Sequence, residues 1–415
     1  MGLERGNRNY WRALAALFMG SFVEFALLYV TQPLLPALTA DFSLSPSVAS
    51  LSVSLTTGAM ALALLPLAAV FSRLQRKPTM LSAMLGASLL AIASGCSPNF
   101  ELLLVCRALQ GMLMAAFPAA AMAYVNEEFE PSGVGLAMGI YIAGTSIGGL
   151  GGRLLVSLLS DFMSWRTALL VMGGFCLLLA ICFFWLLPKA QSRRSTAVKQ
   201  AGLLAALPSL LKTPGILPLY IVGFVALGSF VALYNYIGYI LLAAPYSFSQ
   251  SQVGAVFLLY LLGTVSSMVS GGQVDRRGPG PVLVAGLVMM LSGALLSLGT
   301  PLFFKLGGLG LFTCGFFTTH ATASGWVGRL CRGDKAQAAS LYLFFYYVGA
   351  SVIGTGSGIF LASAGWAGVI GITGLLLSGA LWLAWRQRRL NRSTNPTAAV
   401  AAPPFNKGGK EGAEG

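Results

Sequence analysis

Long apolar runs separated by short polar connections dominate this chain of 415 residues. About 20 consecutive apolar residues cross a bilayer as an α-helix, and a helix satisfies its backbone hydrogen bonds within one segment. The pattern therefore predicts an all-α membrane protein with twelve transmembrane helices. The predicted spans lie at residues 11–38, 47–71, 79–97, 101–125, 134–159, 165–187, 214–243, 251–273, 280–301, 306–328, 338–362 and 365–385.

The composition changes this picture only by excluding other classes of protein. Charged residues make up 9% of the chain and apolar residues 56%, whereas soluble domains contain roughly 25% charged residues. The net charge of +14 is compatible with a nucleic-acid partner, but the basic residues fall between the apolar runs and no nucleic-acid-binding motif accompanies them. We therefore expect a multi-pass protein of the bacterial inner membrane, with the lipid bilayer and no nucleic acid as its partner.

The positions of lysine and arginine predict the orientation in the membrane. Most of the 26 basic residues lie at the two ends of the chain or in every second connection, including Arg73, Arg76 and Lys77. Under the positive-inside rule, this distribution places both termini in the cytoplasm.

The longest internal connection divides the predicted spans into two sets of six. Such a division is typical of transporters that handle substrate near the midplane, between two repeated bundles. We expect an N-terminal six-helix bundle at 1–187, a cytoplasmic basic linker at 188–213, a second six-helix bundle at 214–390 and a disordered cytoplasmic tail at 391–415. We also expect the chain to act as a monomer.

Glu24 lies near the middle of the first span, with long uncharged stretches on either side. A carboxylate there costs on the order of 2.5 to 3.5 kcal/mol on insertion scales, so it persists only where it faces protein or water. The protonated form is the more stable one in such a place, and release of the proton requires solvent or an approaching cation. Glu24 is therefore our candidate for proton coupling. The alternative is a structural carboxyl group that is hydrogen-bonded inside the bundle.

Two arginines, Arg107 and Arg153, also lie within predicted spans, and at about 1.5 Å per residue each is roughly 9 Å below the outer face. If they face the same cavity as Glu24, their side chains can approach that acid or the carbonyl groups freed near Gln32. Two possibilities stay open for Arg153: it pairs with Asp161 at the membrane interface, or it faces the cavity and favours anionic groups.

The second half has no acidic residue inside a predicted span, but it is rich in aromatic side chains with polar tips. Such side chains suit a cavity for organic molecules of varied shape, although each tyrosine can equally be a packing residue. His320, the one histidine of the chain, either titrates in the cavity or is a satisfied buried group. The candidate substrate contacts are Glu24, Gln32, Gln110, Arg153, Asn235, Tyr236, Tyr239, His320 and Tyr346.

A cluster of acidic residues marks the inner end of the fourth span. Glu127 and Glu128 could close a cytoplasmic gate by pairing with Arg73 or Arg276. Exposed pairs of this kind contribute less than about 1 kcal/mol each, enough to bias a two-state equilibrium. A solvated loop explains the cluster equally well. The candidate gating residues are Arg73, Arg76, Lys77, Glu127, Glu128, Asp275 and Arg276.

Glycines recur at spacings of three and four residues in the fifth span, among them Gly144, Gly148 and Gly152. Small residues at these spacings let helix backbones approach closely. This helix can therefore pack against a helix of the other half and seal one side of a cavity, or it can form ordinary close packing.

Two sequence motifs resemble those of the major facilitator superfamily, and the resemblance extends over the whole membrane region. The fourth span carries an RxxQG pattern at Arg107, Gln110 and Gly111, and the loop after the eighth span carries GxxxDRxG from Gly271 to Gly278. The first-half loop keeps the basic residues of the family motif but departs from its acid and its glycine. The chain is most similar to the drug/proton antiporter branch. The resemblance implies the major facilitator fold, alternating access, and either a coupling role for Arg107 or a role in bracing the first helix.

Together these features predict a proton-coupled antiporter that exports small organic, drug-like or lipophilic compounds. The alternative is an exporter of sugars or organic anions in which Arg107 and Arg153 set the charge of the substrate. We expect no enzyme activity, because one mid-membrane acid and one histidine provide neither a catalytic pair nor metal ligands. We expect no cofactor, and the chain has no GxxxxGK[ST] phosphate loop.

Overall fold

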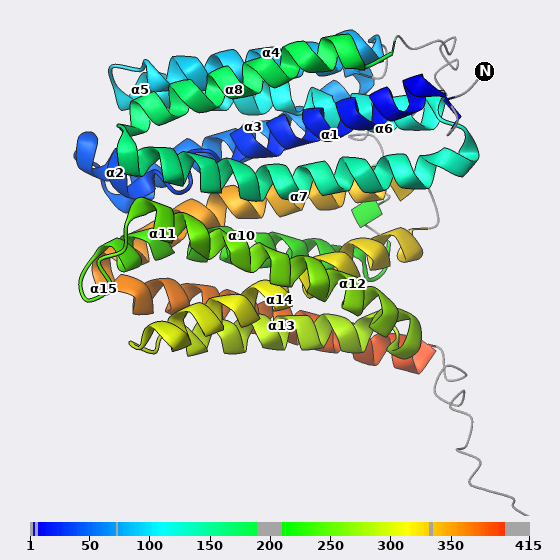
Figure 1. Cartoon of the computed structure of the whole chain (residues 1–415). Coiled ribbons are helices and arrows are strands. Elements are labelled where there is room, and N and C mark those ends of the chain that lie inside the picture. Colours follow the sequence, from blue (N-terminus) through cyan, green and yellow to red (C-terminus); the bar gives the residue numbers. More distant parts are fainter. Residues whose placement is uncertain are drawn as a thin grey trace, which may run out of the picture.

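The computed structural model describes residues 3–4, 7–71, 74–188, 210–211, 213–331 and 335–394, with side chains except at 65–71, 131, 336 and 390–394. Within this part of the chain nearly every residue is helical, and the helices run side by side along one axis (Figure 1). The all-α prediction is confirmed. Arg73 and most of the predicted linker and tail lie outside the described residues, although the last helix continues to Thr394, past the predicted start of the tail.

The first half of the chain folds into eight helical elements. They are α1 (Arg8–Leu28), α2 (Leu35–Asp41), α3 (Pro46–Phe71), α4 (Arg76–Gly95), α5 (Phe100–Met114), α6 (Ala116–Glu128), α7 (Pro131–Phe162) and α8 (Trp165–Leu186). The second half contains α10 (Ile216–Leu242), α11 (Gln250–Ala255), the 3₁₀ helix η1 (Val256–Leu259), α12 (Tyr260–Arg277), α13 (Pro279–Leu296), α14 (Leu302–Leu330) and α15 (Lys335–Thr394).

The first predicted span is broken rather than continuous. Helix α1 ends at Leu28, and α2 begins at Leu35 after an intervening turn. Pro33 and Pro36 have no backbone N–H, and a proline ring clashes with the carbonyl group four residues before it. The break leaves carbonyl groups at the end of α1 without their regular helical partners.

Eleven helical runs in the described part of the chain are long and apolar enough to cross a bilayer. The last run, Gln337–Arg389, includes both of the final two predicted spans. Its backbone leaves the helical conformation at Ala364 and at Gly365, which has φ of +60°. Glycine adopts this left-handed conformation at little cost, so the kink falls where the connection between the two spans was predicted.

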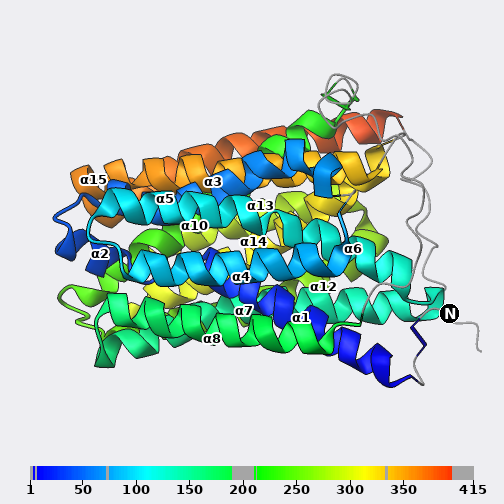
Figure 2. The same ribbon diagram turned by 90° about the horizontal axis from the view of Figure 1, so that it is seen from above.

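Helices α1 to α8 pack mainly on one another, as do α10 to α15, and we call these sets the first and second halves. Figure 1 shows the first half above α10 to α14. The halves meet where α3 packs on α15, α7 on α11 and α2 on α10. In Figure 2 the blue α3 lies beside the orange α15. We call the end of the bundle that carries α2 and α11 the far end, and the end that carries Arg8 the terminal end.

The glycines of α7 pack within the first half, so of the two alternatives for this helix the structure shows close packing and not a seal against the other half. A side chain at Gly144 or Gly148 would overlap the backbone of α1, and one at Gly152 would overlap Ala26 of the same helix. Gly111 of α5 lies equally close to the carbonyl group of Thr56 in α3. These glycines therefore hold one half together instead of sealing the two halves.

Candidate functional site

Glu24 is buried in α1, one helical turn before the helix ends at Leu28, and it is 2% exposed. With so little exposure, Glu24 is enclosed by protein and does not face lipid. Neither carboxyl oxygen has a hydrogen-bond partner among the described residues. The hydrogen bonds that a structural carboxyl group would need are therefore missing in this conformation. An ionised carboxylate in such a place is strongly unfavourable, so the geometry favours the neutral acid.

Arg107 of α5 is fully buried and braces the broken end of α1. Its Nη1 and Nη2 atoms donate to the carbonyl oxygens of Leu27 and Leu28, at 2.9 and 2.7 Å. Its Nε donates to the carbonyl oxygen of Ser52 in α3 at 2.8 Å. It also donates to Gln110, whose amide in turn donates to the carbonyl oxygen of Ala87. Of the two roles that the resemblance implies for Arg107, these contacts match the bracing of the first helix, because its donors bind carbonyl groups of α1 and α3 and not Glu24.

Arg153 of α7 is 3% exposed and lies between the two halves. Its Nε donates to Oε1 of Gln32 at 2.7 Å, and its Nη1 donates to the carbonyl oxygen of Gly149. The guanidinium carbon lies 4.2 Å from the ring centroid of Tyr29, and 5.1 Å from those of both Phe257 and Tyr260 in the second half.

Of the two possibilities stated for Arg153, the structure does not show the ion pair with Asp161. Asp161 instead accepts hydrogen bonds from the backbone N–H groups of Gln250 and Ser251 in α11, at 2.8 and 3.0 Å. Because α11 belongs to the second half, Asp161 is also a contact between the halves. Arg153 and Asp161 lie two helical turns apart on the same helix and both face the second half.

Gln32 connects Arg153 to the second half. Its Nε2 donates to Oδ1 of Asn235 in α10 at 2.8 Å. The Nδ2 of Asn235 has no hydrogen-bond partner among the described residues although it is buried. The residues Tyr29, Gln32, Arg153, Asn235, Phe257 and Tyr260 therefore form one group, which we call the Arg153 cluster.

Tyr236 and Tyr239 were predicted substrate contacts, but in this conformation their hydroxyl groups join the two halves. The hydroxyl of Tyr236 donates to the carbonyl oxygen of Gly354 in its own half at 2.8 Å, and its oxygen lies 3.1 Å from Oγ of Ser50 in the first half. The hydroxyl of Tyr239 lies 2.7 Å from Oγ1 of Thr39. Both groups are thus occupied by the protein itself when the far end is closed.

His320 and Tyr346 lie together in the second half. The His320 ring centroid is 4.5 Å from that of Tyr346, and its Nδ1 is 3.1 Å from the hydroxyl oxygen of Tyr342. Both side chains are only half-buried. His320 is therefore a hydrogen-bonded histidine that retains some exposure.

Two ion pairs of the predicted gating residues at the terminal end lie within one half each. Arg76 forms a bidentate pair with Glu127, at 2.7 and 3.0 Å, in this conformation. Asp275 lies 3.6 Å from Arg329, and both side chains are largely exposed beside a cavity of about 290 Å³.

Two other predicted gating residues make hydrogen bonds that involve the backbone. Lys77 donates to the carbonyl oxygen of Leu187, and the backbone carbonyl of Glu128 accepts from the backbone N–H of Leu3.

Hydrogen bonds between the halves occupy the far end and the middle of the bundle. Besides those already described, hydroxyl groups of α3 and α15 interdigitate: Thr57 lies 3.0 Å from Ser351, and Thr355 donates to Ser54 at 2.6 Å. Close packing adds to them, since a side chain at Gly254 of α11 would overlap Ser157 of α7. The described contacts therefore close the bundle at its far end.

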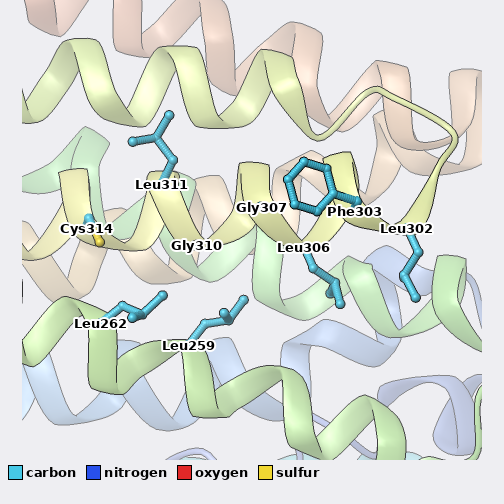
Figure 3. Close-up of a pocket in the computed structure, with 9 residues that line it drawn as sticks. All are labelled: Leu259, Leu262, Leu302, Phe303, Leu306, Gly307, Gly310, Leu311 and Cys314. Atoms are coloured by element: carbon cyan, nitrogen blue, oxygen red, sulfur yellow. The ribbon is translucent and has the colours of Figure 1, made fainter.

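The apolar groove in Figure 3 is not part of this site. It has a volume of about 580 Å³ and lies between η1 and α12 on one side and α14 on the other. The groove is lined by apolar side chains, which suit contact with lipid acyl chains. They include Leu259, Leu306 and Phe303, which is 80% exposed. None of the predicted site residues lines it.

Several residues of the site were not predicted from the sequence. Tyr29 and Phe257 flank Arg153, but in the sequence each is one aromatic residue in a long apolar run. The hydroxyl residues of α3 and α15 did carry a signal. Ser54 and Thr57 are three residues apart, and Ser351 and Thr355 are four apart, so each pair shares a helix face.

Comparisons with known proteins agree with this architecture. The family model of the Major Facilitator Superfamily matches residues 17–240. The chain is 41% identical over 381 residues to the uncharacterized MFS-type transporter YybF of Bacillus subtilis, covering 92% of this chain and 94% of that protein. It is 39% identical over 387 residues to the inner membrane transport protein YnfM of Escherichia coli, covering 93% of each.

A solved structure shows the same fold. The nucleoside transporter NupG (D323A mutant) aligns with a TM-score of 0.76 over 90% of this chain and 99% of its own, at 15% identity. The expected family is confirmed by the family model and by the two relatives. The chain belongs to the Major Facilitator Superfamily, and it is a multi-pass transporter of the bacterial inner membrane.

Proposed function

We propose that this transporter is a proton-coupled antiporter that exports small organic molecules by alternating access. The moving units are the bundles at 1–187 and 214–390, joined by the linker at 188–213, and one chain is sufficient. The observation that carries the proposal is Glu24, a carboxyl group buried near the end of α1 with neither oxygen hydrogen-bonded to any described residue. A buried acid of this kind is neutral when dry and loses its proton when water or a cation reaches it.

The closed far end gives this conformation a place in the cycle. If the termini are cytoplasmic, as the basic residues predict, the far end is periplasmic and the structure is closed to the outside. Glu24 then holds a proton taken up from the periplasm. When substrate and water enter from the cytoplasm, Glu24 releases its proton to the cytoplasm. The deprotonated Glu24 then allows the transporter to return to the outward-facing state.

The contacts at the far end are suited to an equilibrium between two states. They consist of hydroxyl and amide hydrogen bonds, each typically worth about 0.5 to 1.5 kcal/mol net. The Gln32–Asn235 and Thr39–Tyr239 bonds are examples. A set of such bonds can be broken and exchanged for water, so substrate or proton binding can shift the equilibrium by its differential affinity for the two states.

A second candidate function is the export of organic anions or sugars. It is favoured by Arg153, whose buried guanidinium has no carboxylate partner among the described residues. A carboxylate or a sugar hydroxyl that replaced Gln32 would supply an acceptor for this cation. Arg107 contributes less to this alternative, because its donors already bind carbonyl groups.

The test begins with a compound identified from a susceptibility screen of a deletion strain and an overproducing strain against dyes, antibiotics, sugars and metabolite analogues. The purified protein is then reconstituted in proteoliposomes, and uptake or release of this compound is followed under an imposed pH gradient. Glu24→Gln should abolish gradient-driven exchange while the protein still inserts and folds. Glu101→Gln, which removes an exposed carboxylate at the start of α5, is the matched control and should leave exchange unchanged.

Undiminished exchange in Glu24→Gln would reject the proposal. Competition with charged analogues separates the two candidate functions. Competition by lipophilic cations favours the first, and competition only by anions favours the second and should disappear in Arg153→Gln.

A further inference from the structure

The cavity beside Asp275 and Arg329 lies inside the second half at the terminal end, and we call it the terminal cavity. It has a volume of about 290 Å³ and is lined by the end of α12, the start of α13 and the end of α14. A cavity of this size holds a small polar group rather than a drug-sized molecule. No residue of the Arg153 cluster lines it, so it is separate from the site between the halves.

The terminal cavity brings together two opposite charges that do not satisfy each other. Asp275 of α12 and Arg329 of α14 both line it, and their closest atoms, Oδ1 and Nη2, are 3.6 Å apart. This distance is too long for a hydrogen bond. Neither side chain has a hydrogen-bond partner among the described residues, and both are more than half exposed. The carboxylate and the guanidinium are therefore available to a ligand that carries both charges.

Trp326 of α14 adds a neutral donor to the same cavity. Its indole N–H has no hydrogen-bond partner among the described residues. An indole N–H only donates, and a phosphate oxygen is a suitable acceptor for it. The cavity thus offers donors from α14, at Arg329 and Trp326, and an acceptor from α12, at Asp275.

Two glycines on neighbouring helices leave the terminal cavity open. A Cβ atom added at Gly271 of α12 or at Gly325 of α14 would meet no atom within 4 Å. By contrast, a Cβ atom at Gly148, which holds two helices together, would overlap the backbone of Phe22. Close packing therefore does not explain the two glycines of the cavity.

The surface of α12 next to the cavity faces lipid. Val265, Met268 and Gly271 follow one another at intervals of three residues, and Asp275 is four residues further, so all four share one helix face. Met268 is 70% exposed and Val265 is 59% exposed. Exposed apolar side chains within a membrane span contact acyl chains, which are as apolar as they are. The cavity lies beyond this surface at the end of the span, which is the depth of lipid headgroups.

We propose that the terminal cavity binds the headgroup of a phospholipid with a primary ammonium group, as in phosphatidylethanolamine, from the leaflet at the terminal end. The ammonium group donates to Asp275, and the phosphate accepts from Arg329 and Trp326. The acyl chains continue along Met268 and Val265. A quaternary ammonium group has no hydrogen to donate, and a purely anionic headgroup leaves the carboxylate without a partner. This site goes beyond the proposed transport function and does not depend on it.

The experiment titrates the purified full chain in detergent with dioleoyl lipids and measures the affinity of the first bound lipid by native mass spectrometry. The phosphatidylethanolamine, phosphatidylcholine and phosphatidylglycerol forms have the same acyl chains, so only the headgroup differs. Soluble phosphoethanolamine is titrated beside them to separate a free headgroup from a lipid. The variants are Asp275→Asn, Arg329→Gln and Gly325→Leu. The control is Gly379→Leu, at a glycine of α15 that lies outside the cavity and also borders open space.

Phosphatidylethanolamine should bind at least about fivefold tighter than either of the other lipids, because hydrogen bonds to charged groups are the stronger ones. Asp275→Asn and Gly325→Leu should each abolish this preference, the first by removing the charged acceptor and the second by filling the cavity. Arg329→Gln should weaken phosphatidylethanolamine and phosphatidylcholine alike, since both carry the phosphate. Gly379→Leu should preserve all affinities.

Equal binding of the three lipids to the wild-type protein would overturn the inference. Tighter binding of phosphatidylglycerol would do the same, as would a preference that survives either Asp275→Asn or Gly325→Leu. If soluble phosphoethanolamine binds as tightly as the lipid, the assignment to a lipid is wrong. Loss of the preference in Gly379→Leu as well would overturn the assignment to this cavity.

Discussion

Arg107 and Arg153 are both buried in the first half, and neither has a carboxylate partner among the described residues, yet they occupy opposite situations. Arg107 donates only within its own half, to carbonyl groups of α1 and α3 and to Gln110. Arg153 lies against rings of the second half and reaches it again through Gln32. In the proposed cycle the first set of contacts persists, whereas the second breaks each time the far end opens. The same residue type thus serves as a permanent brace in one place and as a reversible contact in the other.

Removal of the Arg107 side chain tests the difference between the two arginines most directly. Arg107→Met leaves the carbonyl groups of Leu27, Leu28 and Ser52 without a donor in an apolar interior, at about 1 to 3 kcal/mol for each unsatisfied group. We expect the free energy of unfolding to fall by about 3 kcal/mol or more, measured by denaturant unfolding in detergent. Arg329→Gln, which removes an exposed ion pair, should change it by less than about 1 kcal/mol. Equal stability of the two variants would show that Arg107 is not a brace.

Glycine substitutions sharpen the comparison, because they separate packing within a half from packing between halves. Gly148→Leu should lower the free energy of unfolding by about 1 to 3 kcal/mol, since its side chain meets the backbone of Phe22 in the same half. Gly254→Leu should fold normally but hold the far end apart, since its side chain meets Ser157 across the interface.

Spin labels at two exposed far-end positions, Phe162 and Phe303, measure this opening in a background without the native cysteines. Gly254→Leu should lengthen the distance between the labels, and Gly148→Leu should not. A reversed pattern would contradict the assignment of the two glycines.

Loss of the reversible contact should have a smaller effect on stability and a visible effect on conformation. Arg153→Gln removes the contacts with Phe257 and Tyr260, which are worth about 1 to 2 kcal/mol. We therefore expect about a tenfold shift toward the open far end, read from the populations of label distances. Arg153→Lys should be intermediate, because lysine keeps the charge but not the planar group. A distance distribution identical to wild type would exclude Arg153 as a contact that controls the far end.

The smallest effect is expected at the terminal end. Glu127→Gln removes the pair with Arg76, which lies within one half and is partly exposed. Such pairs contribute less than about 1 kcal/mol, so the exchange rate of the reconstituted protein should change by less than about fivefold. A large loss of exchange would show that this pair controls the cytoplasmic side after all.

The spans and the family were predictable because both depend on local features of the chain. The apolar runs predicted the helices, and the RxxQG pattern at Arg107 identified the family. Pro33 indicated a break inside the first span, but the long apolar run led to the prediction of one continuous helix. A run of apolar residues indicates that a segment lies in the membrane, whereas one missing N–H group decides whether its helix is continuous.

The partners of the site residues could not be predicted, because they depend on which helix faces which. The glycines of α7 were suited to close packing against any helix, and only the fold assigns them to α1. Glu127 had several arginines within reach in the sequence, and Arg76 proved to be the partner. Glu24 was identified because its charge stands out in an apolar run, while Tyr29 and Phe257 were missed because aromatic residues do not.

The turn between Leu28 and Leu35 separates Gln32, which contacts the second half, from the helix that carries Glu24. Arg107 anchors the end of α1 to α3 on the Glu24 side of this turn. In the proposed cycle, the halves therefore part at Gln32 while α1 stays bound to α3. Water that enters between the parted halves, rather than tension along the backbone, then couples the opening of the far end to the protonation of Glu24.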